Sequence, residues 1–504
     1  MTRRVAWPGG LIAGAAIGAP AIALIGGLLA TTHYGKLADV AIALAVVLPL
    51  LVARFGAGVV LGLLGLGGLN ALPGPNLQLQ HVALTLTAQS VDVLLLIGVL
   101  FFMAPAVPEG RPRRAAVERR MLLWTGAFML LWLFTAGRSV VASQIPIQRA
   151  LYWCSDFAFF AVLIPLFARA FRDERVRQAF IGTVMIGAVV TALTQSFIVI
   201  SHHQVPLLVH TVQVEAISGV PRLYTGAIDL PFAALPLALG AALFGRSPRF
   251  RLYGAITATI CVVSVALALT RARYVGMTVG VAGAAVVWLC VGDTAGRLAR
   301  VRFARALATI VVTAAMLVAY HPSVLGSTEL TAVTSRFNSA TSVVTGQSST
   351  ATIDVRLVEV RELLQYLDGR WLFGLGFLDP SSDHITGLPQ GSIRNGDVGY
   401  LNVVMTMGAF GLVIYIAPLV VLALALVRWR LSRARPPSVE WMAFGGLAYL
   451  IATLISSATL VILFSTTGVV AASAVVALVV RVLAEPASAT AAEPARGRAL
   501  ALSA

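Results

Sequence analysis

The sequence predicts an all-α, polytopic membrane protein, and three observations support this. Of the 504 residues, 58% are hydrophobic and 12% are charged, and the mean hydropathy is +0.88. Apolar runs of roughly 17 to 25 residues recur along the chain, and each is long enough to cross a bilayer as a helix. One long polar segment interrupts the series. We therefore expect about fourteen transmembrane helices and one large extracytoplasmic loop.

The apolar runs set the expected domain organisation. They lie near residues 10–30, 37–53, 55–72, 83–103, 121–136, 151–168, 179–200, 228–244, 252–270, 274–291, 306–320, 398–425, 440–460 and 462–482. Residues 1–320 are predicted to hold transmembrane helices 1–11, and residues 398–485 to hold helices 12–14. Between them, residues 321–397 form the extracytoplasmic loop. Residues 486–504, rich in Ala with Pro and Arg, are expected to form a disordered cytoplasmic tail.

Arginine placement predicts the orientation. Connections that would share one side of the membrane carry 26 of the 37 Lys and Arg residues, so the positive-inside rule places both termini in the cytoplasm. The formal charge of +16 is then a signal of topology and of contact with lipid headgroups, and it does not indicate nucleic-acid binding. All three cysteines fall within apolar spans, where a disulfide framework or redox chemistry is not expected.

Two groups of arginines depart from this pattern. One is the short turn at residues 270–274 (Thr-Arg-Ala-Arg-Tyr), which contains Arg271 and Arg273 and lies between two apolar helices. These side chains can be read as interfacial anchors or as functional cations. The other group lies in the loop and consists of Arg336, Arg356, Arg361, Arg370 and Arg394.

Within the loop, residues 354–367 are predicted to form an amphipathic helix. Apolar side chains recur there at helical spacing, at Ile353, Leu357, Val360, Leu364 and Leu367. Arg361 would lie on another face, where a solvated charged surface is the simpler interpretation. The helix is followed by a glycine-containing turn at residues 370–377 (Arg-Trp-Leu-Phe-Gly-Leu-Gly-Phe), and Asp397 precedes the next span.

These landmarks resemble, in order and spacing, those of the O-antigen ligase and polymerase superfamily. The Arg271–Arg273 turn is similar to the family's arginine turn at the outer end of a helix. The segment from Arg356 to Gly376 is similar to its extracytoplasmic helix with the following Gly-x-Gly turn, and residues 396–401 with Gly408-Ala409-Phe410-Gly411 are similar to its closing motif. The resemblance covers mainly residues 255–425. Two positions differ: Trp371 replaces the usual proline, and Asp397 stands where the ligases have histidine.

The resemblance implies a glycosyltransferase of the bacterial inner membrane that polymerises polyprenyl-pyrophosphate-linked oligosaccharide units, such as O-antigen or exopolysaccharide, on the extracytoplasmic face. Its partners would be the lipid-linked donor and acceptor, membrane lipid, and the flippase and chain-length regulator of the same pathway. Arg271, Arg273, Arg356 and Arg361 are the candidates for binding the pyrophosphate, because guanidinium groups grip phosphate oxygens in a bidentate fork. Arg273 and Arg356 are the first choices for stabilising the leaving group.

The acceptor hydroxyl requires a general base, and Asp397 is the candidate by position, with His384 second. Asp397 could equally be a helix N-cap. No cofactor is expected. Metal is also not expected, because the spacing of His202, His203, His210 and Glu215 in an outer loop matches no familiar metal-binding template.

Other functions stay open at this stage. Ligation of the glycan to another acceptor is the nearest alternative. A lipid or polysaccharide transporter would share the hydropathy profile, although the position of the loop is asymmetric and the two halves show no repeat. A glycosyltransferase that uses a polyprenyl-phosphate sugar would carry acidic residues in its first outer loop, and residues 31–39 contain one. A scaffold would leave the loop unexplained.

Overall fold

The structure of the protein is a computed structural model, and part of the chain is described by it. The described residues are 51–52, 54–68, 96–100, 112–143, 147–201, 211–217, 220–268, 270–290, 301, 304, 335, 360–361, 364–365, 367, 369–377, 399–432, 437–458, 460 and 462–485. The first two predicted spans, the spans at 83–103 and 306–320, most of the loop and the tail lie wholly or largely outside these residues.

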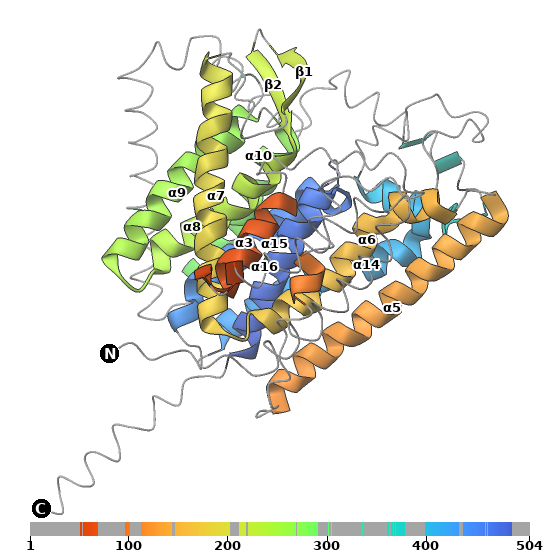
Figure 1. Cartoon of the computed structure of the whole chain (residues 1–504), viewed down its shortest axis with the longest axis horizontal. Coiled ribbons are helices and arrows are strands. Elements are labelled where there is room, and N and C mark those ends of the chain that lie inside the picture. Colours follow the sequence, from red (N-terminus) through yellow and green to blue (C-terminus); the bar gives the residue numbers. More distant parts are fainter. Residues whose placement is uncertain are drawn as a thin grey trace, which may run out of the picture.

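The described part is helical apart from one hairpin (Figure 1). Its α-helices are α3 (Ala57–Gly68), α5 (Pro112–Ser143), α6 (Ile147–Ala170), α7 (Glu174–Ser201), α8 (Asp229–Phe244), α9 (Pro248–Leu267), α10 (Arg271–Leu289), α14 (Gly399–Leu431), α15 (Glu440–Ser456) and α16 (Thr466–Ala484). Each coincides with a predicted apolar span. The all-α class therefore holds for the bulk of the described chain.

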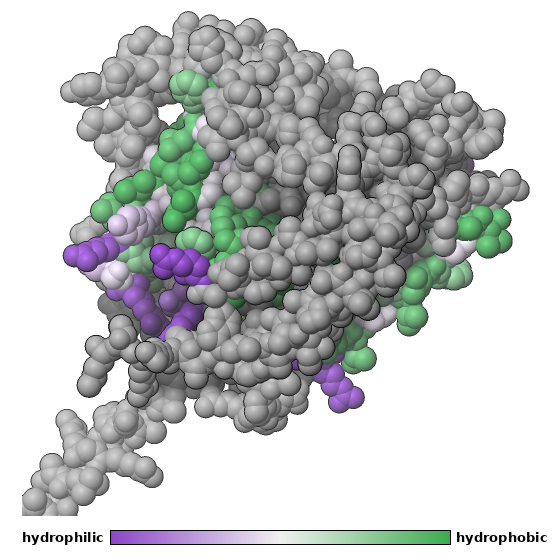
Figure 2. Space-filling view, viewed as in Figure 1, coloured by the Kyte–Doolittle hydropathy of each residue, from purple (hydrophilic) through white to green (hydrophobic). Residues whose placement is uncertain are grey.

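Among the described residues, six helical segments are long and apolar enough to cross a membrane: Arg119–Val141, Glu174–Ile198, Pro248–Leu267, Arg271–Leu289, Gly399–Leu431 and Thr467–Ala484. Three shorter apolar helices, α3, α8 and α15, accompany them. The outer edge formed by α5 is largely hydrophobic (Figure 2), as expected of a surface that faces lipid. The described part is thus compatible with a polytopic membrane protein.

A β-hairpin departs from the all-helical prediction. β1 (Thr211–Ile217) pairs antiparallel with β2 (Val220–Thr225), with Thr211 opposite Thr225 and an irregularity between Gln213 and Glu215. We expected an outer loop here. The hairpin joins α7 to α8 through a short 3-10 helix, Gly226–Ile228, so it leads directly to Asp229, the first residue of α8.

The helix α16 lies at the centre of the described bundle and contacts α6, α8, α14 and α15. About 94% of its most apolar stretch is buried, against 33% for the corresponding stretch of α5. Of its 19 residues, 12 are Ala or Val, and Arg481 is its one charged residue. A helix that is apolar on all sides fits inside a bundle, whereas one with a bulky outward face borders lipid.

Glycines allow α15 to approach its neighbours closely. A Cβ at Gly276 or Gly280 of α10 would overlap atoms of α15, and a Cβ at Gly240 of α8 would overlap the carbonyl of Trp441. Small residues at helix interfaces are typical of membrane bundles, because they let backbones meet without side chains between them. This packing brings the starts of α8 and α10 to the end of α15.

Candidate functional site

Four helix ends meet at one end of the bundle. α10 and α15 are joined there by Ser456, whose hydroxyl donates to the carbonyl of Ala272 at 3.0 Å. α14 begins at the same place, since a Cβ at Gly399 would overlap the carbonyl oxygens of Ser457 and Leu460. α8 joins them through the ion pair described next, so elements far apart in sequence enclose a common region.

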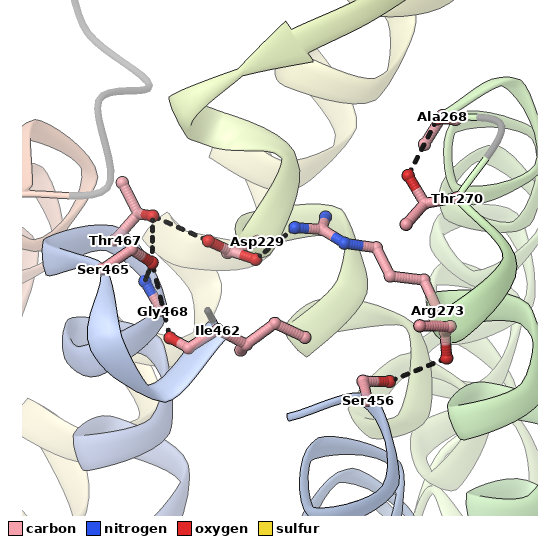
Figure 3. Close-up of polar contacts among 10 residues, drawn as sticks. Asp229, Ala268, Thr270, Arg273, Ser456, Ile462, Ser465, Thr467 and Gly468 are labelled. Atoms are coloured by element: carbon pink, nitrogen blue, oxygen red, sulfur yellow. Dashed lines mark hydrogen bonds and ion pairs between the residues drawn. The ribbon is translucent and has the colours of Figure 1, made fainter. Parts of the chain in front are cut away.

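Arg273 and Asp229 form a buried ion pair in this region (Figure 3). Arg273 Nη2 donates to Asp229 Oδ1 at 2.7 Å, and Thr467 Oγ1 donates to Asp229 Oδ2 at 2.7 Å. Asp229 lies between the other two side chains, with Arg273 reaching it from α10 and Thr467 from α16. The Arg273 guanidinium also lies over the ring of Phe232, 5.6 Å from its centroid.

The local sequence explains why the carboxylate stays buried. Asp229 is the first residue of α8, where the free N–H groups and the helix dipole favour negative charge. Each carboxylate oxygen has a side-chain donor, as a buried charge requires. Arg273 comes in the first turn of α10, where the dipole disfavours a cation, and Asp229 compensates this buried positive charge.

Arg273 retains one donor that the described part of the chain does not satisfy. Its Nη1 is buried and has no hydrogen-bond partner there. The whole residue is only 8% exposed. A buried guanidinium N–H without an acceptor is costly. An external oxygen, such as that of a phosphate, would satisfy this atom. Arg271, two residues earlier, is half-buried at the start of the same helix.

An apolar groove begins next to this cluster. It is small, with a cavity volume of about 40 Å³, lies between α3, α7, α8 and α16, and has an entirely apolar lining. On α8 the lining starts at Leu230, which follows Asp229, and on α16 it starts at Val470, one turn after Thr467. Asp229 and Thr467 therefore lie at the ends of α8 and α16 from which the groove starts.

A second feature involves the glycine turn at residues 370–377 and a break in α14. Gly408 has φ 74° and ψ −177° inside α14, a conformation that L side chains rarely adopt. Two turn amides donate to α14 carbonyls, Leu375 N to Met405 O at 2.6 Å and Gly376 N to Thr406 O at 3.0 Å.

Two amides of α14 donate in turn to carbonyls of the glycine turn. Ala409 N bonds to Trp371 O at 2.8 Å, and Phe410 N bonds to Leu372 O at 3.3 Å. In an unbroken helix these amides would bond to residues 405 and 406. Four hydrogen bonds to the turn therefore replace two hydrogen bonds within the helix. The two amides and the two carbonyls that the break releases all have partners in the turn.

Arg138 and Ser139, near the end of α5, hold the other side of the turn. Arg138 Nη2 donates to Phe373 O at 2.9 Å and to Gly374 O at 2.6 Å. Ser139 Oγ accepts from Phe377 N at 2.6 Å and donates to Thr135 O at 2.7 Å. The turn is thus fixed between α5 and α14.

The apolar stripe of the loop helix also reaches α14. Val360 and Leu364 pack around Leu367, which forms a small core with Leu401 and Met405 of α14. Arg361 is exposed, which agrees with a solvated face. The predicted amphipathic pattern is confirmed at these positions, and the rest of the stripe lies outside the described residues.

The predicted site residues are thus distributed unevenly. Arg273 is buried in the ion pair, and Arg271 precedes it by two residues on α10. Arg361 belongs to a separate element that packs against α14. Arg356, His384 and Asp397 lie outside the described residues. Among the residues that are described, no group of three or more His, Cys, Asp or Glu side chains could hold a metal ion.

No protein-family model matches this chain, and no curated protein matches it either.

Sequence reasoning missed three residues that shape the region. Asp229 carries a detectable signal, because an acid at the start of an apolar span is costly unless it is paired. Arg138 carries one as well: it follows the predicted span 121–136 on the outer side, so it breaks the positive-inside pattern as Arg273 does. Thr467 has no such signal, since a threonine within an apolar helix is common.

Proposed function

We propose that the protein is a membrane glycosyltransferase that polymerises oligosaccharide units carried on polyprenyl pyrophosphate, at the extracytoplasmic face. The observation that carries the proposal is the unsatisfied, buried Nη1 of Arg273 beside an apolar groove. A lipid with a phosphorylated head requires both features, a fixed cation and an apolar channel. The order of the motifs adds support, because it resembles that of the O-antigen ligase and polymerase superfamily.

The proposed reaction is a displacement at an anomeric carbon. A hydroxyl oxygen of the acceptor glycan forms a bond to the anomeric carbon of the donor sugar. The bond from that carbon to the pyrophosphate breaks, and the lipid pyrophosphate leaves with the electron pair. The hydroxyl proton passes to a general base. Energy comes from the activated donor, so the step requires no nucleotide.

In this scheme Arg273 binds a pyrophosphate oxygen through Nη1 while Asp229 holds its other Nη atom. A cation that is already oriented stabilises the charge of the leaving group without reorganising during the reaction. Arg271 lies next to it on α10. Arg356 and Arg361 are proposed to supply further cations from the loop, and Asp397 is proposed as the base with His384 as the alternative.

The break in α14 calls for a comparison with transporters, because interrupted helices in transporters expose backbone groups that bind ions. Here the groups of Met405, Thr406, Ala409 and Phe410 that the break releases all bond to the turn at residues 371–376. The break therefore serves to fix the loop. This use of the backbone favours a loop-based site over an ion-binding site at this position.

Deletion of the gene, followed by gel electrophoresis of the cell's polysaccharide, tests the proposal. Loss of the polymer ladder with accumulation of single repeat units is the expected result. Accumulation of lipid-linked polymer would instead identify a ligase. Unchanged glycan would exclude both activities. Purified protein in vesicles with lipid-linked repeat units should then form polymer, and addition of a chelator should not stop it.

A further inference from the structure

The glycine turn exposes large apolar side chains although it belongs to a polar loop. Trp371 is 45% exposed, Leu372 66% and Phe373 44%. In a water-facing loop, three consecutive exposed apolar side chains would be unfavourable. Their surroundings indicate a different environment.

The exposed side chains continue the lipid-facing surfaces of two membrane helices. The ring of Phe373 contacts that of Phe134 on α5, with centroids 5.8 Å apart, and that of Phe410 on α14, with centroids 6.1 Å apart. Phe134 and Phe410 are themselves about half exposed. Both belong to segments long and apolar enough to span a membrane. The turn and the two helices therefore present one continuous apolar surface.

Partners within the protein satisfy many of the polar backbone groups of the turn, which favours its entry into the acyl-chain layer. Non-helical backbone is tolerated at membrane depth only where other parts of the protein satisfy its polar groups. Here the N–H groups of Leu375 and Gly376 and the carbonyls of Trp371 and Leu372 bond to α14. The carbonyls of Phe373 and Gly374 accept from Arg138.

The positions of Phe134 and Phe410 along their helices indicate how deep the turn lies in the bilayer. Fourteen residues separate Phe134 from Arg120 on α5, and eighteen separate Phe410 from Arg428 on α14, which correspond to about 21 and about 27 Å of helix. Arg120 and Arg428 belong to the arginine groups expected at the cytoplasmic surface. The acyl-chain layer is about 30 Å thick, so Phe134 and Phe410 both lie inside its outer boundary.

We infer that residues 371–373 form a re-entrant membrane anchor, with Leu372 and Phe373 inserted among the lipid acyl chains of the outer leaflet. Trp371 lies at the interface, where tryptophan is favoured. Arg370 is exposed. Its positive charge lies close enough to that of Arg138 to repel it, and both side chains lie at the level of the headgroups. The anchor fixes the end of the loop helix at the bilayer surface. This inference does not depend on the proposed enzymatic activity.

Spin labelling tests the inference. In full-length protein with Cys154, Cys261 and Cys290 replaced by Ala, a nitroxide is attached to Leu372→Cys and the protein is reconstituted in phospholipid vesicles. Gln365→Cys, exposed on the loop helix, gives the aqueous reference, and Leu424→Cys, exposed on α14, gives the lipid reference. The ratio of accessibility to oxygen over accessibility to a water-soluble nickel complex should place Leu372 with Leu424. A ratio equal to that of Gln365 overturns the inference.

A second measurement leaves the cysteines unchanged. The fluorescence of Trp371 is obtained by subtracting the emission of Trp371→Leu from that of the parent protein. Both proteins are measured in vesicles whose lipids carry bromine near the headgroup and in vesicles whose lipids carry it near the chain ends. Quenching should be stronger with bromine near the headgroup. If neither lipid quenches this component, the turn is in water and the inference is wrong. The result stands even if the labelled variants fold poorly.

Discussion

Arg273 and Asp229 are 44 residues apart in sequence and form a buried ion pair of 2.7 Å between the first turns of α10 and α8. Two further contacts fix the pair, the Thr467 hydroxyl on the carboxylate and the Phe232 ring beneath the guanidinium. The pair joins three helices and leaves one guanidinium nitrogen for an external ligand. It therefore affects both stability and the proposed chemistry.

Asp229→Asn should destabilise the protein by about 3–5 kcal/mol, because it leaves the Arg273 charge buried and unpaired. The thermal unfolding midpoint of purified protein should fall accordingly. The double variant Asp229→Leu with Arg273→Met should regain most of the loss, since replacing both charges by apolar groups is often nearly neutral. A double variant as unstable as Asp229→Asn would show that the pair matters for another reason.

Arg273→Lys should lower polymerisation by at least an order of magnitude while leaving the fold intact. Lysine can keep the contact with Asp229 but has no second nitrogen for the phosphate oxygen. Turnover is measured with lipid-linked repeat units in vesicles. Arg249→Lys, exposed at the start of α9, is the matched control and should keep full activity. Equal activity of the two variants would remove Arg273 from the mechanism.

Gly408→Ala should lower the unfolding midpoint, because the positive φ strains any L side chain by about 1–2 kcal/mol and the new Cβ would overlap Leu372 O. Gly126→Ala on α5 is the control, since a Cβ there meets open space and alanine favours a helix by about 1 kcal/mol. The control should be neutral or stabilised. A neutral Gly408→Ala would mean that the turn does not pack against α14 as described.

Arg138→Met should release the turn from α5, because the carbonyls of Phe373 and Gly374 lose their donor. Hydrogen exchange measured by mass spectrometry should accelerate in peptides covering 371–377 and 405–411. Exchange in α16 should not change. Arg138→Lys should give a smaller effect because the ammonium group can still donate to these carbonyls. Uniform acceleration across the protein would indicate general unfolding and contradict a local role.

Asp397→Asn separates the two interpretations of that residue. If Asp397 is the general base, the catalytic step should slow severely with little effect on substrate binding, because an amide accepts no proton. If it is a helix cap, asparagine serves nearly as well and activity should survive. Single-turnover kinetics distinguish these outcomes. Survival of full activity would direct the search to His384.

The sequence determined the class of this protein and the positions of its helices. Hydropathy is local, so each apolar run identifies a helix without knowledge of its neighbours, and all ten α-helices of the described part coincide with predicted spans. The boundaries were less certain. α5 begins at Pro112, nine residues before the predicted span, because its arginine-rich first turns remain helical outside the apolar run.

The sequence also drew attention to Arg273 and to the glycine turn, since charge on the outer side and clustered glycines are visible without a structure. The β-hairpin was not predicted, although polar and apolar residues alternate in β1 from Thr211 to Ala216 as they do in a half-buried strand. The sequence also did not assign a role to Arg138, although the same charge argument applies to that residue.

Only the tertiary structure decided which groups meet. The pairing of Arg273 with Asp229, the hydroxyl of Thr467 on the same carboxylate, and the insertion of the glycine turn into the break of α14 depend on which helix ends lie side by side. That arrangement is set by close packing at glycines such as Gly276 and Gly240. These contacts join residues far apart in the chain, and a local pattern carries no information about such partners.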